Sequence, residues 1–317
     1  MSRLLLSRLK CIARSVPRDP RAYQIVALSG LLALGMLRFG FDIAPLDAAI
    51  IITSALAAQG LAERMGRPAS PAGTAAPAAA TWPSALISAL SMTLLLRARH
   101  PMWLVVAVLL AVFSKFALRV PRVGAPGTKH VLNPTNGAIA ILLACGAPVW
   151  VSPSQCGHSL GLLLLLAGFG SLVVYRSERS DVTLAFLLAW AAVLFTRAAW
   201  VHQAWIAPLH QLENGAVALF AFHMISDPRT TPDSRTGRSV FAVLVAVGAG
   251  VVQFVLFRTN GLLWSLAVCS LLVPVLDRVF PGRAYHWPAH PRPAASPHHA
   301  QEAAHVAAHA VRSAVAR

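Results

Sequence analysis

Long apolar runs, separated by short polar or basic loops, fill the sequence between residues 22 and 280. Runs of this length with almost no charge are typical of membrane-spanning helices, which need about 20 residues to cross the hydrocarbon. The pattern predicts ten spans, and the short ones, 83–98, 135–151 and 213–226, are expected to be tilted, thinned or broken helices. The predicted spans are residues 22–39, 44–62, 83–98, 101–119, 135–151, 158–175, 181–199, 213–226, 239–257 and 261–280.

The fold class predicted by this pattern is all-α: a polytopic integral membrane protein with about ten transmembrane helices. Composition agrees, because 56% of the residues are hydrophobic and only 12% are charged, which excludes an ordinary soluble domain. The transmembrane domain, 22–280, contains a Pro/Ala-rich linker at 66–82. It is flanked by a basic leader, 1–21, and by a tail, 281–317, rich in proline, histidine and alanine.

The basic residues predict the orientation in the membrane. Most of the 27 lysines and arginines fall in alternate loops, on the cytoplasmic side if the N-terminus is cytoplasmic. We therefore expect a multi-pass protein of a bacterial-type inner (cytoplasmic) membrane with both termini in the cytoplasm, and an uncleaved leader lying on the membrane surface. Because the arginines form short clusters between spans, the net charge of +16 indicates contact with membrane lipid and not with nucleic acid.

Metal and iron–sulfur sites are not expected. The scattered cysteines, Cys11, Cys145, Cys156 and Cys269, contain no CxxC pair. A helix in the tail would place His298, Glu302, His305 and His309 on one face, a spacing that could hold a divalent metal. A solvated tail without metal is the favoured alternative.

The first candidate binding segment begins at Lys129-His130 and continues into a predicted helix. Asn133 is a plausible N-cap and Pro134 suits the first helical turn. A helix N-terminus at membrane depth offers free N–H groups and a positive dipole end to a phosphate, a carboxylate or the carbonyls of a flavin. An ordinary capped helix start is the alternative. The candidate residues here are Lys129, His130, Asn133, Thr135 and Asn136.

The second candidate segment is the polar stretch 227–238, which cannot lie in hydrocarbon because its backbone groups would be unsatisfied. Ser234 or Thr236 is expected to cap the helix that follows. The candidate residues are Asp227, Thr230 and Thr231, either as a polar wall beside a cofactor or ion path or as a structural corner between spans.

Two further charged positions have structural interpretations. Lys115, inside a predicted span, is expected to extend to the cytoplasmic headgroups, or else to face a cavity. Asp277 and Arg278 are expected to form a pair at the cytoplasmic surface.

Five motifs give the chain a family resemblance. They are Asp19–Gln24, Lys129–Pro134, Phe222–Pro228, Pro232–Arg238 and Pro274–Arg278. In this order they resemble the membrane subunits RnfD and NqrB of the Rnf and Na⁺-pumping NADH:quinone oxidoreductase complexes. The resemblance implies ten helices in two five-helix repeats, a bound flavin (riboflavin or FMN), electron transfer within the membrane with Na⁺ or H⁺ transport, and other membrane redox subunits as partners.

One feature of that family is missing here. The family joins FMN through its phosphate to the threonine of a Ser-Gly-Ala-Thr-like motif after the fifth span. The corresponding loop, Trp150 to Leu160, has no such threonine, and none occurs between Thr135 and Thr183. The departure puts covalent FMN in doubt and leaves a non-covalent flavin near Asn133 as the expectation.

No nucleophile–base arrangement and no nucleotide-binding loop is present, so we expect neither catalytic residues nor direct NADH binding. The sequence favours a membrane subunit of a redox-driven electron transport complex that holds a flavin. The alternative is a transporter, channel-like protein or scaffold of the same fold that has lost electron transfer, which the missing threonine favours. Flavin absorbance of the purified protein distinguishes the two.

Overall fold

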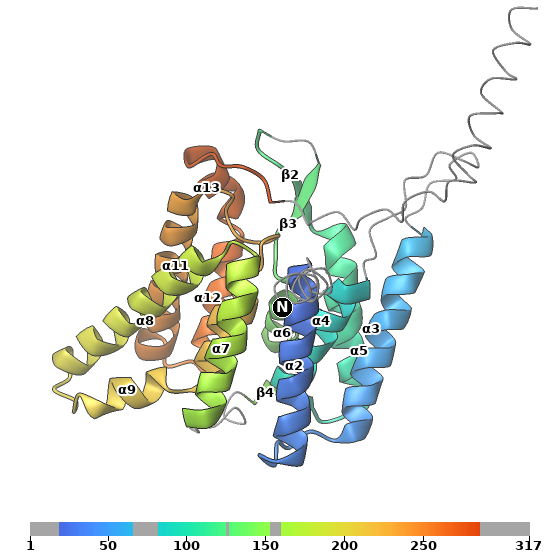
Figure 1. The fold of residues 1–317 in the computed structure, drawn as a ribbon, viewed down its shortest axis with the longest axis horizontal. Coiled ribbons are helices and arrows are strands. Elements are labelled where there is room, and N and C mark those ends of the chain that lie inside the picture. The colour runs from blue at the N-terminus through green and yellow to red at the C-terminus, as the bar shows by residue number, and fades with distance from the viewer. Residues whose placement is uncertain (1–18, 66–81, 125–126, 153–159, 286–317) are drawn as a thin grey trace, which may run out of the picture. The chain divides into compact units, whose positions relative to one another are not determined.

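The computed structural model describes residues 19–65, 82–124, 127–152 and 160–285, which lie in the compact unit Met1–His286 (Figure 1). The first elements are α2 (Pro20–Leu37), α3 (Pro45–Met65), α4 (Trp82–Leu95), β1 (Leu96–Ala98), α5 (Pro101–Ala117), β2 (Arg119–Pro121), β3 (Thr128–His130), α6 (Pro134–Ala144) and β4 (Val149–Val151). The later ones are α7 (Leu160–Arg176), α8 (Ser180–Trp200), α9 (Ile206–Leu212), α10 (Gly215–Leu219), η2 (Phe220–Met224), α11 (Arg235–Gly250), η3 (Val251–Val255), α12 (Gly261–Ser270) and α13 (Val273–Val279). The elements η2 and η3 are single π-helical turns.

Side-chain caps fix where several helices begin. Asp19 and Asn133 each precede a proline in the first turn, and their side chains accept the backbone N–H groups of Arg21 and Asn136. Ser234 accepts the N–H of Gly237 at 3.0 Å, as the sequence predicts, so α11 begins immediately after it. Each cap satisfies a donor that would otherwise be unpaired at the start of a helix.

The all-α prediction is correct for most of the chain but misses two small sheets. Strand β1 pairs antiparallel with β4, and β2 pairs antiparallel with β3. The predicted spans 83–98, 101–119 and 135–151 therefore each end in an extended strand. Pairing two interrupted helices through short strands satisfies backbone groups that the helices have released. Apolar residues such as Leu96 and Val149 have the same hydropathy in both conformations, so composition could not reveal the change.

The helix lengths support membrane insertion without confirming ten spans. In the described residues, four helices are long and apolar enough to cross a membrane, namely α2, α3, α8 and the helix Arg235–Val255. A fifth span results if α12 and α13, bent by 54°, count as one. The other predicted spans contain shorter apolar helices. The count of ten and the two five-helix repeats remain predictions.

The two halves of the chain nevertheless pack with matching pairs of helices (Figure 1). In the first half α3 packs on α5, and α5 on α6; in the second half α8 packs on α11, and α11 on α12. Between the halves, α2 contacts α7, and α6 contacts α12. The junction thus consists of α2, α6, α7 and α12, and the predicted binding segment at the start of α6 lies within it.

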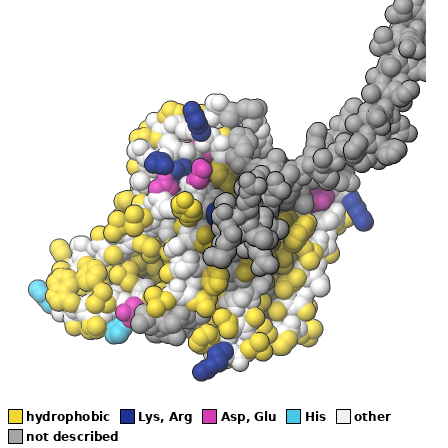
Figure 2. All heavy atoms as spheres, viewed as in Figure 1, with side chains coloured by type: hydrophobic (Ala, Val, Ile, Leu, Met, Phe, Trp, Pro, Cys, Tyr) yellow, Lys and Arg dark blue, Asp and Glu magenta, His cyan; other side chains and the backbone are white. Residues whose placement is uncertain are grey.

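Apolar side chains cover much of the visible sides of the helices, whereas charged side chains gather near their ends (Figure 2). Exposed residues include Leu61, Leu172, Leu188 and Val268, each on a different helix. A soluble monomer rarely exposes so much contiguous apolar surface, and lipid tails accommodate it without cost. Together with its apolar helices, this surface identifies a multi-pass membrane protein. The predictions for the leader 1–21, most of the linker 66–82 and most of the tail 281–317, with its four candidate metal ligands, fall outside the described residues.

Gly170 allows α7 to approach η2 closely. A Cβ added at Gly170 would lie 2.5 Å from Cγ of Phe222, whereas one added at Gly168, two residues earlier on α7, meets nothing within 4 Å. We expect Gly170→Ala to destabilise the protein by about 1–3 kcal/mol because Phe222 must move within a packed core. Gly168→Ala is the matched control and should be neutral or slightly stabilising. Thermal unfolding in detergent would check this, and equal stability of the two variants would contradict the close packing.

Candidate functional site

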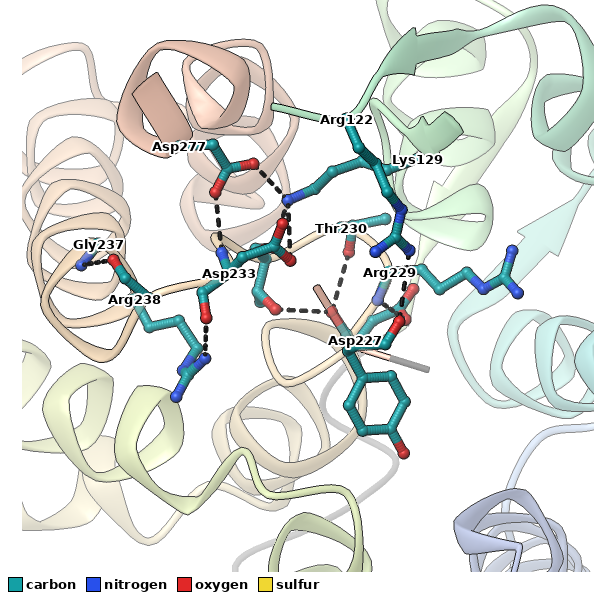
Figure 3. Close-up of polar contacts among 12 residues, drawn as sticks. Arg122, Lys129, Asp227, Arg229, Thr230, Asp233, Gly237, Arg238 and Asp277 are labelled. Atoms are coloured by element: carbon teal, nitrogen blue, oxygen red, sulfur yellow. Dashed lines mark hydrogen bonds and ion pairs between the residues drawn. The ribbon is translucent and has the colours of Figure 1, made fainter. Parts of the chain in front are cut away.

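A buried ammonium group joins three distant parts of the chain at one end of the helices (Figure 3). Lys129 Nζ lies 2.6 Å from Oδ2 of Asp277 and 3.7 Å from Oδ1 of Asp233, and it donates to the carbonyl oxygen of Thr231 at 2.9 Å. The second oxygen of Asp277 accepts the backbone N–H of Asp233 at 2.8 Å. The lysine is 3% exposed and the two aspartates are 8% or less, so these charges compensate one another away from solvent.

The same polar stretch is also attached to α8. Arg179 Nε donates to the hydroxyl of Thr231 at 3.2 Å. Arg238 pairs with Asp181, at the start of α8, at 2.5 Å, and donates to the carbonyl oxygen of Asp233 at 2.9 Å. Burial, and secondarily the neighbouring Arg238, lowers the pKa of Arg179 to about 10. The stretch 227–238 is therefore held from two sides, by β3 and by α8.

Two charged positions differ from the sequence-based expectations. Asp277 is buried and paired with Lys129, so the predicted surface pair with Arg278 is wrong; Arg278 is exposed. Lys115 is also buried and donates to Ser84 at 3.1 Å, so it faces the protein interior and not the headgroups. In both cases the partner comes from an element remote in sequence, which local spacing could not identify.

The predicted residues of α6 bond to neighbouring helices. Asn133 caps α6 and its Nδ2 donates to the carbonyl oxygen of Met224 at 3.4 Å. Asn136 Nδ2 donates to the carbonyl oxygen of Leu263 at 3.1 Å, and its Oδ1 is buried with no partner. The hydroxyl of Thr135 donates to the carbonyl oxygen of Ser88 at 3.4 Å. These three side chains link α6 to η2, α12 and α4 respectively.

The predicted residues of the polar stretch form a tight corner. The hydroxyls of Thr230 and Thr231 donate to the carbonyl oxygen of Asp227 at 3.5 and 3.1 Å, and the Asp227 carboxylate accepts the N–H of Arg229 at 3.0 Å. Burial raises the pKa of Asp227, and the bond from Arg229 only partly offsets this. The geometry matches the structural-corner alternative, while Thr231 also faces Lys129.

His130 lies apart from the Lys129 side chain because successive residues of a strand point to opposite faces. It is opposite Arg119 in the β2–β3 pair, and its Nδ1 is buried without a partner. Burial, followed by the charges of Arg229, Arg119 and Lys115, lowers the pKa of His130 to about 3. The imidazole is therefore neutral at physiological pH.

A cavity of about 200 Å³ lies toward the other end of the same helices. Its lining comes from β1, β4, α8, η2, η3 and the start of α12. Met224 and Leu263, whose carbonyl groups receive the amides of Asn133 and Asn136, are among the lining residues. The proline-marked helix α6 therefore holds part of the cavity wall, although none of the eight residues predicted from the sequence lines the cavity.

Two lining side chains carry buried polar atoms without a partner: Trp190 Nε1, a donor, and Gln211 Oε1, an acceptor. Both π-helical turns also contribute, Phe220 from η2 and Gln253 from η3, and such turns are frequent at functional sites. The sequence reasoning missed Trp190 and Gln211. Their only sequence signal is a polar atom in or beside an apolar run, which many membrane residues share.

Metal ligands do not converge in the part of the chain that the structure describes. No three His, Cys, Asp or Glu side chains there are close enough to hold a metal ion. Residues 153–159, which include most of the loop where the family carries its threonine, fall outside that part.

Removing the buried ammonium should be strongly destabilising. Lys129→Met leaves the carboxylates of Asp233 and Asp277 buried without a cation, at a cost of about 3–5 kcal/mol. Arg278→Met, at an exposed position on α13, is the control and should have little effect. Thermal unfolding in detergent, followed by circular dichroism, measures both. A Lys129→Met protein as stable as the control would show that the three contacts contribute nothing.

His130 should make stability depend on pH. Its folded-state pKa, about 3, is below the ordinary value of 6.5, so the unfolded chain binds a proton first as the pH falls. Stability is therefore full above pH 6.5 and declines below it. His130→Asn should lose less of its melting temperature between pH 7 and pH 5 than the natural protein does, as differential scanning fluorimetry would show. Parallel declines would exclude a buried neutral imidazole.

Comparison with known proteins places this geometry in a family. Residues 149–286 match the family described as NQR2, RnfD, RnfE. The chain is 32% identical over 139 residues to a protein of Stutzerimonas stutzeri named as a subunit of the ion-translocating oxidoreductase complex, covering 42% of this chain and 38% of that relative. For the protein of the same name from Tolumonas auensis, the identity is 33% over 78 residues, covering 25% of this chain and 22% of the relative.

The matched region contains most of the site. It includes Trp190, Gln211, Asp227, the two aspartates that hold Lys129, and both π-helical turns. The matches span well under half the length of these relatives. The resemblance predicted from the five motifs is confirmed: this is an RnfD-like chain, and its residues 149–286 belong to the NQR2, RnfD, RnfE family.

Proposed function

We propose that this chain is a membrane subunit of an ion-translocating oxidoreductase complex and that it binds a flavin without a covalent link. Relatives named as subunits of such a complex support the first part. The cavity beside α6 supports the second, and the observation that carries it is the pair of unpartnered polar atoms on Trp190 and Gln211. Other membrane redox subunits would be the partners, and Na⁺ or H⁺ transport would be coupled to electron flow.

The residues present fit the flat ring of a flavin. The pyrimidine edge of the isoalloxazine carries carbonyl acceptors and an N–H donor. The Trp190 N–H and the Gln211 carbonyl oxygen offer the complementary groups, and leaving such atoms unpaired in a buried site is costly. Apolar side chains, including Leu95, Val217 and Phe220, form much of the rest of the wall. Ligand pockets usually enclose about 300–1,000 Å³, so a cavity of about 200 Å³ suits the ring more than the whole cofactor.

The protein's part in this function is to bind, orient and shield. A bound flavin would supply the electron-accepting and electron-donating chemistry, which side chains lack. Trp190 and Gln211 would fix the edge of the ring, and the apolar wall would exclude water. Asn133 and Asn136 would act indirectly, because their amides hold the backbone of Met224 and Leu263 in that wall.

Purified protein should be yellow, and acid precipitation should release the flavin into the supernatant. Trp190→Phe removes the N–H and keeps the aromatic bulk, so we expect flavin affinity to fall by roughly 2–10-fold, the worth of one hydrogen bond. Trp200→Phe, at a side chain 82% exposed, is the matched control and should bind flavin normally. Absorbance and flavin fluorescence during dialysis measure the loss.

Three results would contradict parts of the proposal. Flavin retained in the acid pellet would contradict non-covalent binding. Equal flavin retention by the Trp190 and Trp200 variants would exclude this cavity as the site. A colourless preparation that stays colourless after incubation with riboflavin and FMN would favour the second candidate, a transporter or channel-like protein of the same fold, which the missing threonine supports.

A further inference from the structure

A group of cations surrounds the β2–β3 hairpin on the side away from Asp233 and Asp277. It consists of Lys115, Arg119, Arg122 and Arg229, named here the hairpin cations. In the part of the chain that the structure describes, none of the four has a carboxylate within ion-pair distance. Their side-chain hydrogen bonds go to neutral oxygens: Arg119 to the carbonyl of Lys115, Lys115 to Ser84, and Arg122 to the carbonyls of Thr128 and Tyr285.

The nearby acid does not balance this charge. Asp227 is the acid that interacts with Lys115 and Arg229, and burial disfavours its ionised form. His130 adds no negative charge, since it is neutral or positive in every protonation state. Burial lowers the pKa of Arg229, and the charges of Arg122 and Arg119 lower it further. Several like charges held close together and partly buried are costly unless an anion joins them.

Two buried polar atoms in this group have no partner: Arg122 Nη1 and His130 Nδ1. The side chain of Arg229 makes no hydrogen bond or ion pair among the described residues, and Figure 3 shows its guanidinium directed away from Lys129. Arginine presents a planar fork of donors that matches the oxygens of a phosphate. The cations are thus arranged to bind an anion with several oxygens.

An apolar surface lies directly beside these cations. Phe116 and Leu118, at the end of α5, are exposed, and the guanidinium carbon of Arg119 lies 5.2 Å from the ring centre of Phe116. A change from exposed apolar to exposed basic side chains within one turn is typical of the boundary between acyl chains and headgroups. A molecule bound here would therefore contact an apolar strip and a cationic site together.

We propose that the hairpin cations bind the phosphate of an anionic phospholipid whose acyl chains lie along α5. Arg122 and Arg229 provide the forked contacts, and Arg119 completes the site at the membrane surface. A soluble phosphate compound shares the headgroup chemistry but has nothing to place on Phe116 and Leu118, so the lipid is the better occupant. This site is separate from the cavity at the other end of the helices and does not depend on flavin binding.

Native mass spectrometry of the full chain in a neutral detergent tests the proposal, with phosphatidylglycerol and phosphatidylcholine as probes. The natural protein should retain phosphatidylglycerol in preference to phosphatidylcholine. Each arginine near an anionic surface contributes about 1 kcal/mol, so Arg229→Gln should weaken phosphatidylglycerol binding by roughly fivefold and Arg122→Gln with Arg229→Gln by roughly 25-fold. Arg278→Gln, an exposed arginine on α13, makes the same charge change outside the group and should leave binding unchanged.

The outcomes separate the possible sources of the phosphate. Equal weakening by Arg278→Gln and Arg229→Gln would mean a general charge effect and would overturn the site. Displacement of the lipid by millimolar glycerol phosphate, but not by equal ionic strength of chloride, would assign the site to a soluble phosphate and overturn the lipid. If Arg229→Gln does not fold, Arg229→Lys keeps the charge and loses the fork. It should then weaken binding less than the fivefold expected for glutamine, and unchanged binding would overturn the forked contact.

Discussion

The structure depends on one buried cation held between two carboxylates. Lys129 draws together the β2–β3 hairpin, the polar stretch after η2 and the start of the final helix, segments separated by 102 and 148 residues along the chain. Buried charges of this kind contribute little over an apolar core when complete, but losing one partner is very costly. The ammonium therefore acts as a lock: its three oxygen partners must be in place together or the end of the helices opens.

The remaining architecture follows from where that lock places α6. Its N-terminus begins at the locked end, and its two asparagine amides reach the backbone of η2 and α12, which form part of the cavity wall. Polar side chains bonded to backbone groups released by π-helical turns or helix starts suit a membrane interior, where water cannot satisfy them. One helix thus connects a charged network at one end with a cavity at the other, and a change at either end would be transmitted through α6.

The two functional proposals use opposite ends of the molecule, and charge separates them. The cavity is mostly apolar with a few amide and indole groups, so it suits a neutral, flat molecule. The hairpin cations carry excess positive charge beside an apolar strip, so they suit an anion with a lipid tail. Lys129, although it belongs to the same hairpin, is excluded from the anion site because Asp233 and Asp277 already neutralise it.

The sequence by itself determined the features that depend on neighbouring residues: the apolar helices, the caps at Asn133 and Ser234, the corner after Asp227 and the family motifs. Each rests on contacts within about four residues, which spacing reveals. It also identified the two proline-marked segments that meet. Only the tertiary structure decided that Asp277 pairs with Lys129 instead of Arg278, that three apolar runs end in strands, and that Trp190 and Gln211 face a common cavity. These outcomes depend on which distant elements cross, and the burial of a charge or an indole N–H is a property of the assembled helices, not of any one of them.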